Sequence, residues 1–197
     1  KRFITNALRA GMLTVMARTD RNKKGASGVS AFLVDPSLEG VHISKADDKM
    51  GQRGTKTSDV IFENVRVPAS ALMGGKVGQG FYTAIRVLDR GRLHLSSVAT
   101  GISERIIEEA LNYAAERKQF GQVIGEFQLV QAMLADSQAE LYASTSMTRD
   151  AARKFDAGDD ISMLAACCKM FTTEASGRIA DRAVQIHGGA GYMSEYK

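Results

Sequence analysis

The sequence of 197 residues is poor in the residues that build covalent or metal-bound scaffolds: it has two Cys, three His, two Pro and no Trp. Cys167 and Cys168 are adjacent, so one backbone geometry cannot easily bridge them, and they lack the spacing of metal ligands. This excludes a disulfide-stapled scaffold and indicates a reducing compartment. His42, His94 and His187 stand in unrelated contexts without a Gly-x-Ser-x-Gly motif, so we predict neither a hydrolase triad nor a metal site.

Long hydrophobic runs are also missing from the sequence. No apolar run approaches the ~18 residues that a transmembrane helix needs, and the first residues lack the basic-then-apolar pattern of a signal peptide. We therefore expect no membrane insertion. What is present is a balanced composition, with 44% hydrophobic and 24% charged residues and 19 Gly. This balance is typical of ordinary globular proteins and excludes disorder and collagen-like repeats.

The net charge of +4 is concentrated in the first part of the chain. Residues 1–73 hold 12 Lys and Arg against 7 Asp and Glu, whereas residues 74–197 hold 14 against 15. A basic excess raises nucleic acid as a partner, but acidic residues interrupt each basic run and no recognition-helix or stacking-aromatic motif is present. We expect no nucleic acid; a polyanionic small molecule explains the charge more economically.

Residues 1–73 show the pattern of short strands. Runs rich in Val, Ile and Phe are separated by Gly, Asp, Asn and Ser, at residues 12–17, 29–34, 41–43, 60–62 and 65–67. Turn signals every 8–15 residues predict an antiparallel sheet or barrel. Pro68 and the glycines between residues 74 and 80 mark the boundary to the next part of the chain, so we expect a β domain at 1–73 and a helical domain at 74–197.

From about Gly78 the hydrophobic period changes to 3.6 residues, which predicts helices. A first helix carries one set of residues on a single face: Val98, Ile102, Ile106, Ala110 and Tyr113. A second helix is expected at about 127–155, with Val130, Leu134 and Leu141 inward. Because the joining segments at 121–126 and 156–160 are short, neighbouring helices should be antiparallel.

The third helix has the clearest period. Asp159 and Asp160 are expected to cap its start, and Gly188 and Gly189 to close it. Apolar residues then follow at steps of three and four: Ile161, Leu164, Cys168, Phe171, Ala175, Ile179, Ala183 and Ile186. The sequence as a whole therefore predicts an α+β protein, with an antiparallel β-sheet or β-barrel domain followed by an antiparallel helical bundle.

Residues 185–192, with the sequence QIHGGAGY, form the most unusual local feature. One interpretation is a helix C-cap followed by a flexible turn. The other is close backbone approach to a phosphate or ribose, since only Gly exposes its N–H groups without a Cβ in the way. A helix rather than a strand precedes the glycines, so this is not a dinucleotide-binding fingerprint of the Rossmann type.

Two charged motifs allow alternative interpretations. At residues 116–122, the cations Arg117 and Lys118 either complement the negative end of a helix dipole or, for Arg117, form a phosphate clamp beside Phe120. At residues 88–93, Asp89 and Arg92 lie one helical turn apart, where a solvated ion pair is the default interpretation.

The order of these motifs resembles the acyl-CoA dehydrogenase family over almost the whole chain. In chain order the matching segments are FITN at 3–6, VMART at 15–19, SAFLV at 30–34, KMGQR at 49–53, FENV at 62–65, LDRGR at 88–92, RKQFG at 117–121, LAD at 134–136 and QIHGG at 185–189. The resemblance implies part of a middle β domain at 1–73 and the first three helices of a C-terminal four-helix bundle at 74–197.

The resemblance also implies an activity. Enzymes of this family use FAD to oxidise the Cα–Cβ bond of an acyl-CoA to a trans-2-enoyl-CoA, and they pass the electrons to an electron-transfer flavoprotein. The cofactor carries the difficult chemistry while the protein positions the thioester and excludes water. It further implies a homo-oligomer, commonly a dimer of dimers, in the bacterial cytoplasm or the mitochondrial matrix.

By position, the resemblance assigns residues to two binding roles. The residues expected to face the flavin are Phe3, Ile4 and Thr5, on a strand of the β domain. The residues expected to grip the pyrophosphate and adenosine of the FAD held by a neighbouring subunit are Arg117, Gln119, Phe120, Gln128, Gln185, Gly188 and Gly189. Asp89 and Arg92 are expected to line the acyl-CoA site. The family usually has Trp at the position of Phe3, so the indole N–H and part of the apolar area are lost at the flavin edge.

The catalytic base is the main departure from the family pattern. Most members place a Glu in a Tyr-Glu-Gly-Thr segment after the glycine turn, which we expect beyond Lys197; a minority place it just before the Arg of the Leu-Asp-x-x-Arg motif, where this chain has Gly91. We therefore expect an internal portion of such an enzyme, without its N-terminal helical domain. As an isolated polypeptide it should bind FAD weakly at most and should not dehydrogenate. The alternatives are an acyl-CoA oxidase-like flavoenzyme, which reoxidises in air, and a non-catalytic helical-bundle assembly module.

Overall fold

The computed structural model describes residues 1–196 and has an α+β fold with two compact units, Lys1–Arg86 and the part of the chain that begins at Val87. The first unit is built from antiparallel two-stranded sheets. Their strands are β1 (Ile4–Thr5), β2 (Leu13–Arg18), β3 (Val29–Val34), β4 (Val41–Ile43), β5 (Thr57–Ser58) and β6 (Val60–Phe62). β1 pairs with β5, β2 with β3, and β4 with β6.

The longest ladder joins β2 and β3, from Leu13 opposite Val34 to Arg18 opposite Val29. Leu13 and Val34 are buried in the core of this unit, together with Ala7 and Val60. Strands β3, β4 and β6 have the predicted bounds, and β2 begins one residue later than expected. Alternating Val, Ile and Phe residues thus produced the expected antiparallel pairs, because one face of each pair can be buried.

The expected strand at residues 65–67 is wrong. Asn64 has a φ of 52°, which turns the chain out of the extended conformation after β6. Val65 and Val67 then pack their side chains against the core of the unit instead of joining a sheet. The strands β1 and β5 were not predicted, since two residues are too few to show a period.

The unit boundary at Arg86 lies later than the boundary predicted after residue 73. The physical reason is the packing of the glycine segment on β3. The amide of Gly78 donates a hydrogen bond to Ser30 Oγ at 2.8 Å. A Cβ at Gly80 would lie 2.4 Å from the backbone carbon of Ser30, so only glycine permits this approach.

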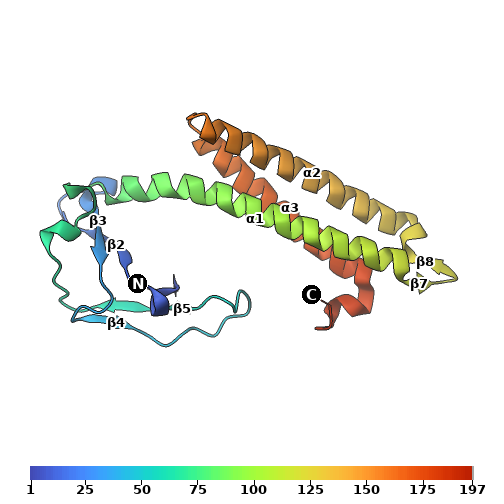
Figure 1. Ribbon diagram of the computed structural model, residues 1–197, viewed down its shortest axis with the longest axis horizontal. Helices are drawn as coiled ribbons and strands as arrows, with labels where there is room; N and C mark the ends of the chain where they lie inside the picture. The colour runs from blue at the N-terminus through green and yellow to red at the C-terminus, as the bar shows by residue number, and fades with distance from the viewer. Residues whose placement is uncertain (197) are drawn as a thin grey trace. The chain divides into compact units, whose positions relative to one another are not determined.

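Three long helices follow, α1 (Gly80–Glu116), α2 (Gln128–Asp156) and α3 (Ser162–His187) (Figure 1). A short hairpin of β7 (Lys118–Gln119) and β8 (Gln122–Val123) joins α1 to α2. Helices α2 and α3 are antiparallel, as predicted. Two contacts show the direction: Cys168 donates to the carbonyl of Met147, whereas Arg178, further along α3, pairs with Glu140, which lies earlier on α2. None of the described helices is long and apolar enough to cross a membrane.

The expected inward face of α3 is confirmed. Its apolar residues at steps of three and four are all buried or half-buried, and Ala165, Ala175 and Ile179 are almost completely so. Asp160 accepts a hydrogen bond from the amide of Ser162 at 2.9 Å, and this bond lowers the pKa of Asp160. Gly188 follows the helix with a φ of 57°. The end of α3 was therefore correctly signalled by Gly188. At its start Asp160 accepts from a helix amide, but Ile161 stands at the cap position and makes no side-chain capping bond.

The apolar face predicted for α1 is only partly buried. Ala110 lies in the core, but Val98 and Ile102 are exposed by 56% and 45%. The buried side of α1 consists mainly of small residues: Ser96, Ala99, Ser103, Ile107, Ala110 and Ala114. The hydroxyls of Ser96 and Ser103 are satisfied by carbonyls one turn earlier on α1.

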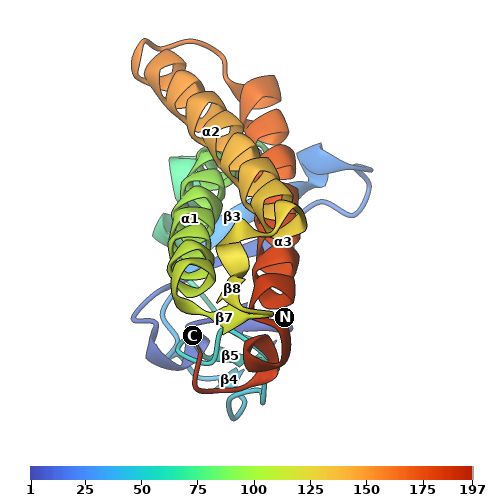
Figure 2. The same cartoon turned by 90° about the vertical axis from the view of Figure 1, so that its right-hand side faces the viewer.

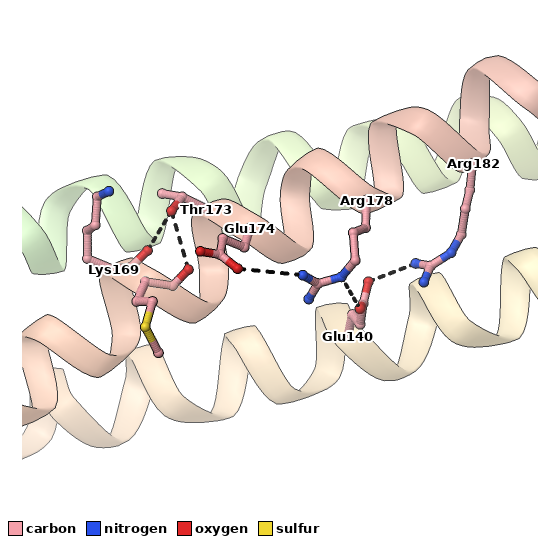
Figure 3. A network of polar contacts seen from close by, with 7 residues as sticks. Glu140, Lys169, Thr173, Glu174, Arg178 and Arg182 are labelled. Carbon is pink, nitrogen blue, oxygen red and sulfur yellow. Dashed lines mark hydrogen bonds and ion pairs between the residues drawn. The ribbon is translucent and has the colours of Figure 1, made fainter.

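Glu140 forms an ion-pair network between α2 and α3 (Figure 3). Its two carboxylate oxygens accept hydrogen bonds of 2.7 Å from Arg178 and Arg182. Burial raises the pKa of Glu140, but the hydrogen bonds and charges of Arg182 and Arg178 outweigh it, so the net pKa lies below its usual value.

Candidate functional site: the hairpin and glycine turn at one end of the helices

One end of the helical unit brings together the end of α1, the start of α2 and the end of α3 (Figures 1 and 2). Ala110 and Ala114 of α1 and Ile186 of α3 form the buried core there, against Ile124 and Val130. Seven of the residues expected to contact FAD belong to segments at this end: Arg117, Gln119, Phe120, Gln128, Gln185, Gly188 and Gly189. The fold thus gathers two sequence motifs that lie far apart in the chain.

The β7–β8 hairpin holds the first of these motifs. Its two turn residues, Phe120 and Gly121, have φ values of 53° and 85°, which are typical of a tight hairpin turn. Phe120 is 93% exposed, although the bulky ring makes a positive φ costly. The hairpin turn therefore presents an aromatic ring to its surroundings.

Arg117 directly follows α1, where the helix dipole attracts a cation. Within residues 1–196 its guanidinium makes no ion pair. Gln119 donates to the carbonyl of Lys118 at 2.7 Å, and Gln128 is exposed at the first position of α2. This leaves a guanidinium, two amides and an aromatic face exposed within one short segment.

The glycine turn, Gly188–Tyr192, is a short 3₁₀ helix that follows α3. Gly188 has φ 57° and ψ −133°, a conformation essentially restricted to glycine. Gly191 is needed for packing, since a Cβ there would lie 2.6 Å from the carbonyl oxygen of Val184. At Gly189, in contrast, no atom of the chain lies within 4 Å of the Cβ position. The backbone there is open to approach from outside the chain.

An aromatic cluster supports the turn and was missed by the sequence analysis. The ring of His187 stacks on Tyr113 of α1, and Tyr196 lies edge-on to both. His187 Nδ1 is 2.8 Å from the carbonyl oxygen of Ala183. The sequence had placed Tyr113 on a helix face and treated His187 only as a possible catalytic group, because no local pattern joins residues 74 positions apart.

The other three residues expected to contact FAD lie in the first unit. Ile4 and Thr5 form β1, opposite Ser58 and Thr57. Thr5 is exposed and Phe3 is 65% exposed with a φ of 54°. An exposed aromatic ring in a left-handed conformation is uncommon for reasons of folding alone.

Asp89 and Arg92, expected at the acyl-CoA site, lie near the start of α3 rather than near its end. Arg92 donates to Asp89 Oδ1, and Ser162 donates to Asp89 Oδ2 at 3.1 Å. Asp89 thereby connects α1 to the first residue of α3. The expected ion pair at positions i and i+3 forms, but the Asp89 side chain is only 18% exposed, so the pair is partly buried rather than solvated.

Of the two free cysteines Cys168 is buried, and the described residues offer no metal-binding cluster. Burial raises the pKa of the Cys168 thiol, which donates to the carbonyl of Met147. Among residues 1–196 no cluster of three or more His, Cys, Asp or Glu side chains could hold a metal ion. Gly91, on α1, offers no carboxylate.

These features fit a phosphate-bearing cofactor such as FAD. The open backbone at Gly189 allows close approach of a phosphate, and the free guanidinium of Arg117 can bind it through paired hydrogen bonds. Phe120 offers an aromatic face to a nucleotide base or ring.

Comparison with known proteins gives the family. The family model of the acyl-CoA dehydrogenase middle domain matches residues 1–65, and the family model of the acyl-CoA dehydrogenase C-terminal domain matches residues 78–197. The chain therefore belongs to the acyl-CoA dehydrogenase family. This confirms the family resemblance seen in the order of the sequence motifs.

Two curated relatives share 41% identity with the whole chain: a 3-(aryl)acrylate reductase of Clostridium sporogenes, matched over 52% of its length, and the probable acyl-CoA dehydrogenase YngJ of Bacillus subtilis, matched over 51%. The structure of butyryl-CoA dehydrogenase from Megasphaera elsdenii is 36% identical, with a TM-score of 0.95 over 100% of this chain and 51% of the other. The chain thus spans about half the length of the relatives it matches.

Proposed function

We propose that the protein is an FAD-dependent acyl-CoA dehydrogenase, which oxidises an acyl-CoA thioester to a trans-2-enoyl-CoA and passes the electrons to an electron-transfer flavoprotein. The observation that carries the proposal is the end of the helical unit, where the fold gathers Arg117 and the glycine turn at Gly188 and Gly189. Membership of the family supports the reaction class. A relative from Acetobacterium woodii is named as a subunit of a caffeyl-CoA reductase-Etf complex, which supports the electron partner.

In this proposal each segment has a separate role. Arg117 and the backbone at Gly188 and Gly189 bind the diphosphate of FAD, while Phe120 packs against its adenosine part. Gln119, Gln128 and Gln185 supply amides for the remaining polar atoms. When bound, FAD supplies the acceptor for hydride. The exposed, unsatisfied state of these side chains in the chain alone is what an added ligand would use.

Phe3, Ile4 and Thr5 are proposed to face the flavin ring. Phe3 provides apolar surface, and the hydroxyl and backbone of β1 provide hydrogen bonds. Asp89 and Arg92 are proposed to border the acyl-CoA site, with Asp89 holding Arg92 in place through their ion pair. We further propose that two copies of the protein share the cofactor site, so that it functions as a dimer or a dimer of dimers.

A second candidate is the reverse reaction, reduction of an α,β-unsaturated acyl group. The names of several relatives favour it: the reductase of Clostridium sporogenes, the caffeyl-CoA reductase subunit, and an acryloyl-CoA reductase (NADH) of Anaerotignum propionicum. A third candidate is an oxidase, since a solved structure 28% identical, with a TM-score of 0.94, is that of a prolyl acyl carrier protein oxidase. All three share the flavin chemistry and differ in the electron donor or acceptor.

The test is anaerobic titration, with saturated and α,β-unsaturated acyl-CoA, of the purified, FAD-loaded enzyme in its longest natural form that contains these residues. Bleaching of the flavin absorbance by a saturated acyl-CoA, with transfer of the electrons to an electron-transfer flavoprotein, is the expected result. Reoxidation of dithionite-reduced protein by an unsaturated acyl-CoA alone would identify a reductase. Rapid reoxidation by air would identify an oxidase, and absence of bound FAD would overturn all three assignments.

A further inference from the structure

The strand β1 contains a β-bulge directly before Ile4. Ile4 pairs with Ser58 and Thr5 with Thr57. One step earlier, the amide of Val60 donates to the carbonyl of Lys1 at 2.8 Å, and the backbone nitrogen of Lys1 donates to the carbonyl of Val60 at 2.7 Å. Two residues, Arg2 and Phe3, therefore stand opposite one, Asp59, which defines a bulge.

The side chain of Asp59 contacts both residues of the bulge. Its Oδ1 accepts a hydrogen bond from the amide of Phe3 at 3.3 Å, in place of the ladder bond that the bulge removes. Its Oδ2 lies 3.2 Å from Arg2 Nε. The guanidinium of Arg2 in turn lies over the Phe3 ring, 5.1 Å from its centre. One carboxylate thus contacts both residues of the bulge.

The bulge places Phe3 in an unfavourable conformation. A φ of 54° is costly for a bulky aromatic residue, and burial does not compensate for it, because the ring is 65% exposed. Bulges are common beside binding sites, where they turn a side chain toward a ligand. The Asp59 contacts hold the strained backbone that points this ring outward.

We propose that Asp59 is a positioning residue that fixes the bulge at Arg2 and Phe3 and so sets the aromatic surface and the strand edge that receive the flavin ring. This inference rests on the proposed function, because it takes the ligand of this segment to be FAD. Asp59 itself does not touch the ligand; it acts through the backbone of Phe3.

The test uses the purified protein in three variants. Asp59→Ala removes both contacts of the carboxylate and is expected to weaken FAD binding about 10-fold, with a change in the visible spectrum of the bound flavin. Asp59→Asn keeps an oxygen that accepts from the Phe3 amide and is expected to bind FAD within about twofold of the unmodified protein. The control is Asp35→Ala, which removes an exposed carboxylate of the same unit that binds its own turn through Ser37 and should leave both readouts unchanged.

A second measurement requires no cofactor. Amide hydrogen exchange at Phe3 is expected to be faster in Asp59→Ala than in Asp35→Ala, since only the first removes the acceptor of that amide. If Asp59→Ala gives no folded protein, Asp59→Glu replaces it; the longer side chain displaces the carboxylate and should likewise weaken FAD binding while thermal unfolding remains cooperative.

The outcomes separate this inference from the proposed function. Suppose the unmodified protein binds FAD and Asp59→Ala binds it with the same affinity and the same flavin spectrum. This result overturns the role of Asp59 and leaves the proposed function standing. An unmodified protein that binds no FAD overturns both. Weaker FAD binding and an altered flavin spectrum in Asp59→Ala, with near-normal affinity and spectrum in Asp59→Asn, support both the role of Asp59 and the proposed function.

Discussion

The imidazole of His187 stacks on the phenol ring of Tyr113, with ring centres 4.3 Å apart and planes inclined by 22°. Tyr113 lies in the last turn of α1, four residues before Arg117. His187 is the last residue of α3 and is followed by Gly188. The stack therefore joins the two segments proposed to bind the diphosphate of FAD.

Replacement of His187 tests this connection. His187→Ala loses the stack and the hydrogen bond to the carbonyl of Ala183, so the free energy of unfolding should fall by about 1–3 kcal/mol. Urea denaturation followed by circular dichroism measures it. Tyr142→Ala is the control, because Tyr142 is 73% exposed and should change stability by less than about 0.5 kcal/mol. Equal effects of the two substitutions would contradict a role for the stack.

Two glycines of the same turn should respond differently to alanine. Gly191→Ala places a Cβ 2.6 Å from the carbonyl oxygen of Val184 and should lower stability by about 1–3 kcal/mol. Gly189→Ala meets no atom of the chain and should leave stability within about 0.5 kcal/mol, yet it should weaken FAD binding because the new methyl group blocks the backbone. Thermal unfolding measures the stability of both variants, and FAD titration measures their affinity for the cofactor. Wild-type FAD affinity in a stable Gly189→Ala protein would refute the role of this backbone.

Arg117 and Lys118 form a matched pair for the proposed diphosphate contact. Arg117→Ala should weaken FAD binding by about 10-fold or more, because a bidentate, charge-assisted pair of hydrogen bonds is lost. Lys118→Ala removes the same formal charge from the neighbouring position and should change the affinity by less than about threefold. Isothermal titration at two salt concentrations provides the measurement. Similar losses in both variants would indicate general attraction by positive charge rather than a specific clamp.

The Glu140 network predicts a pH dependence of stability. The folded-state pKa of Glu140 is lowered, so its contribution is fully present above the ordinary pKa of 4.5 and is lost as the pH falls through the lower folded value. Glu140→Gln should cost about 2 kcal/mol at pH 7, since two charged hydrogen bonds are weakened. The difference from the unmodified protein should shrink below about pH 4.

Urea denaturation between pH 3 and pH 7 measures this difference. Glu174→Gln is the control: its carboxylate lies 4.0 Å from Arg178 and is largely exposed, so its effect should be small at every pH. A stability difference for Glu140→Gln that is independent of pH would show that packing, and not the ionised carboxylate, is responsible.

Local pattern was sufficient for several features of the fold. The three strands with exact bounds combine β-branched and aromatic residues with flanking turn residues, and both are local properties. The buried face of α3 followed from a 3.6-residue period, and its end from Gly188. The family itself was recognisable from the order of short motifs, several of which lie in these elements.

Other features depended on contacts between distant residues. The interior side of α1 is set by small residues that fit against neighbouring helices, and hydrophobicity alone favoured the exposed Val98 and Ile102 instead. The conformation of Asn64 turns the chain after β6 and removed the expected next strand. In each case tertiary packing overrode the local preference, which is a weak constraint by comparison.

The sequence by itself therefore determined the three helices, the longer strands and the residues that are candidates for binding FAD, because period, capping and motif order are written along the chain. Only the tertiary structure decided that the two diphosphate motifs meet through His187 and Tyr113, and that Asp59 holds a bulge beneath Phe3. The physical reason is that stacking and side-chain to backbone hydrogen bonds require particular distances and angles, and residues 56 or 74 positions apart acquire these only when the chain folds.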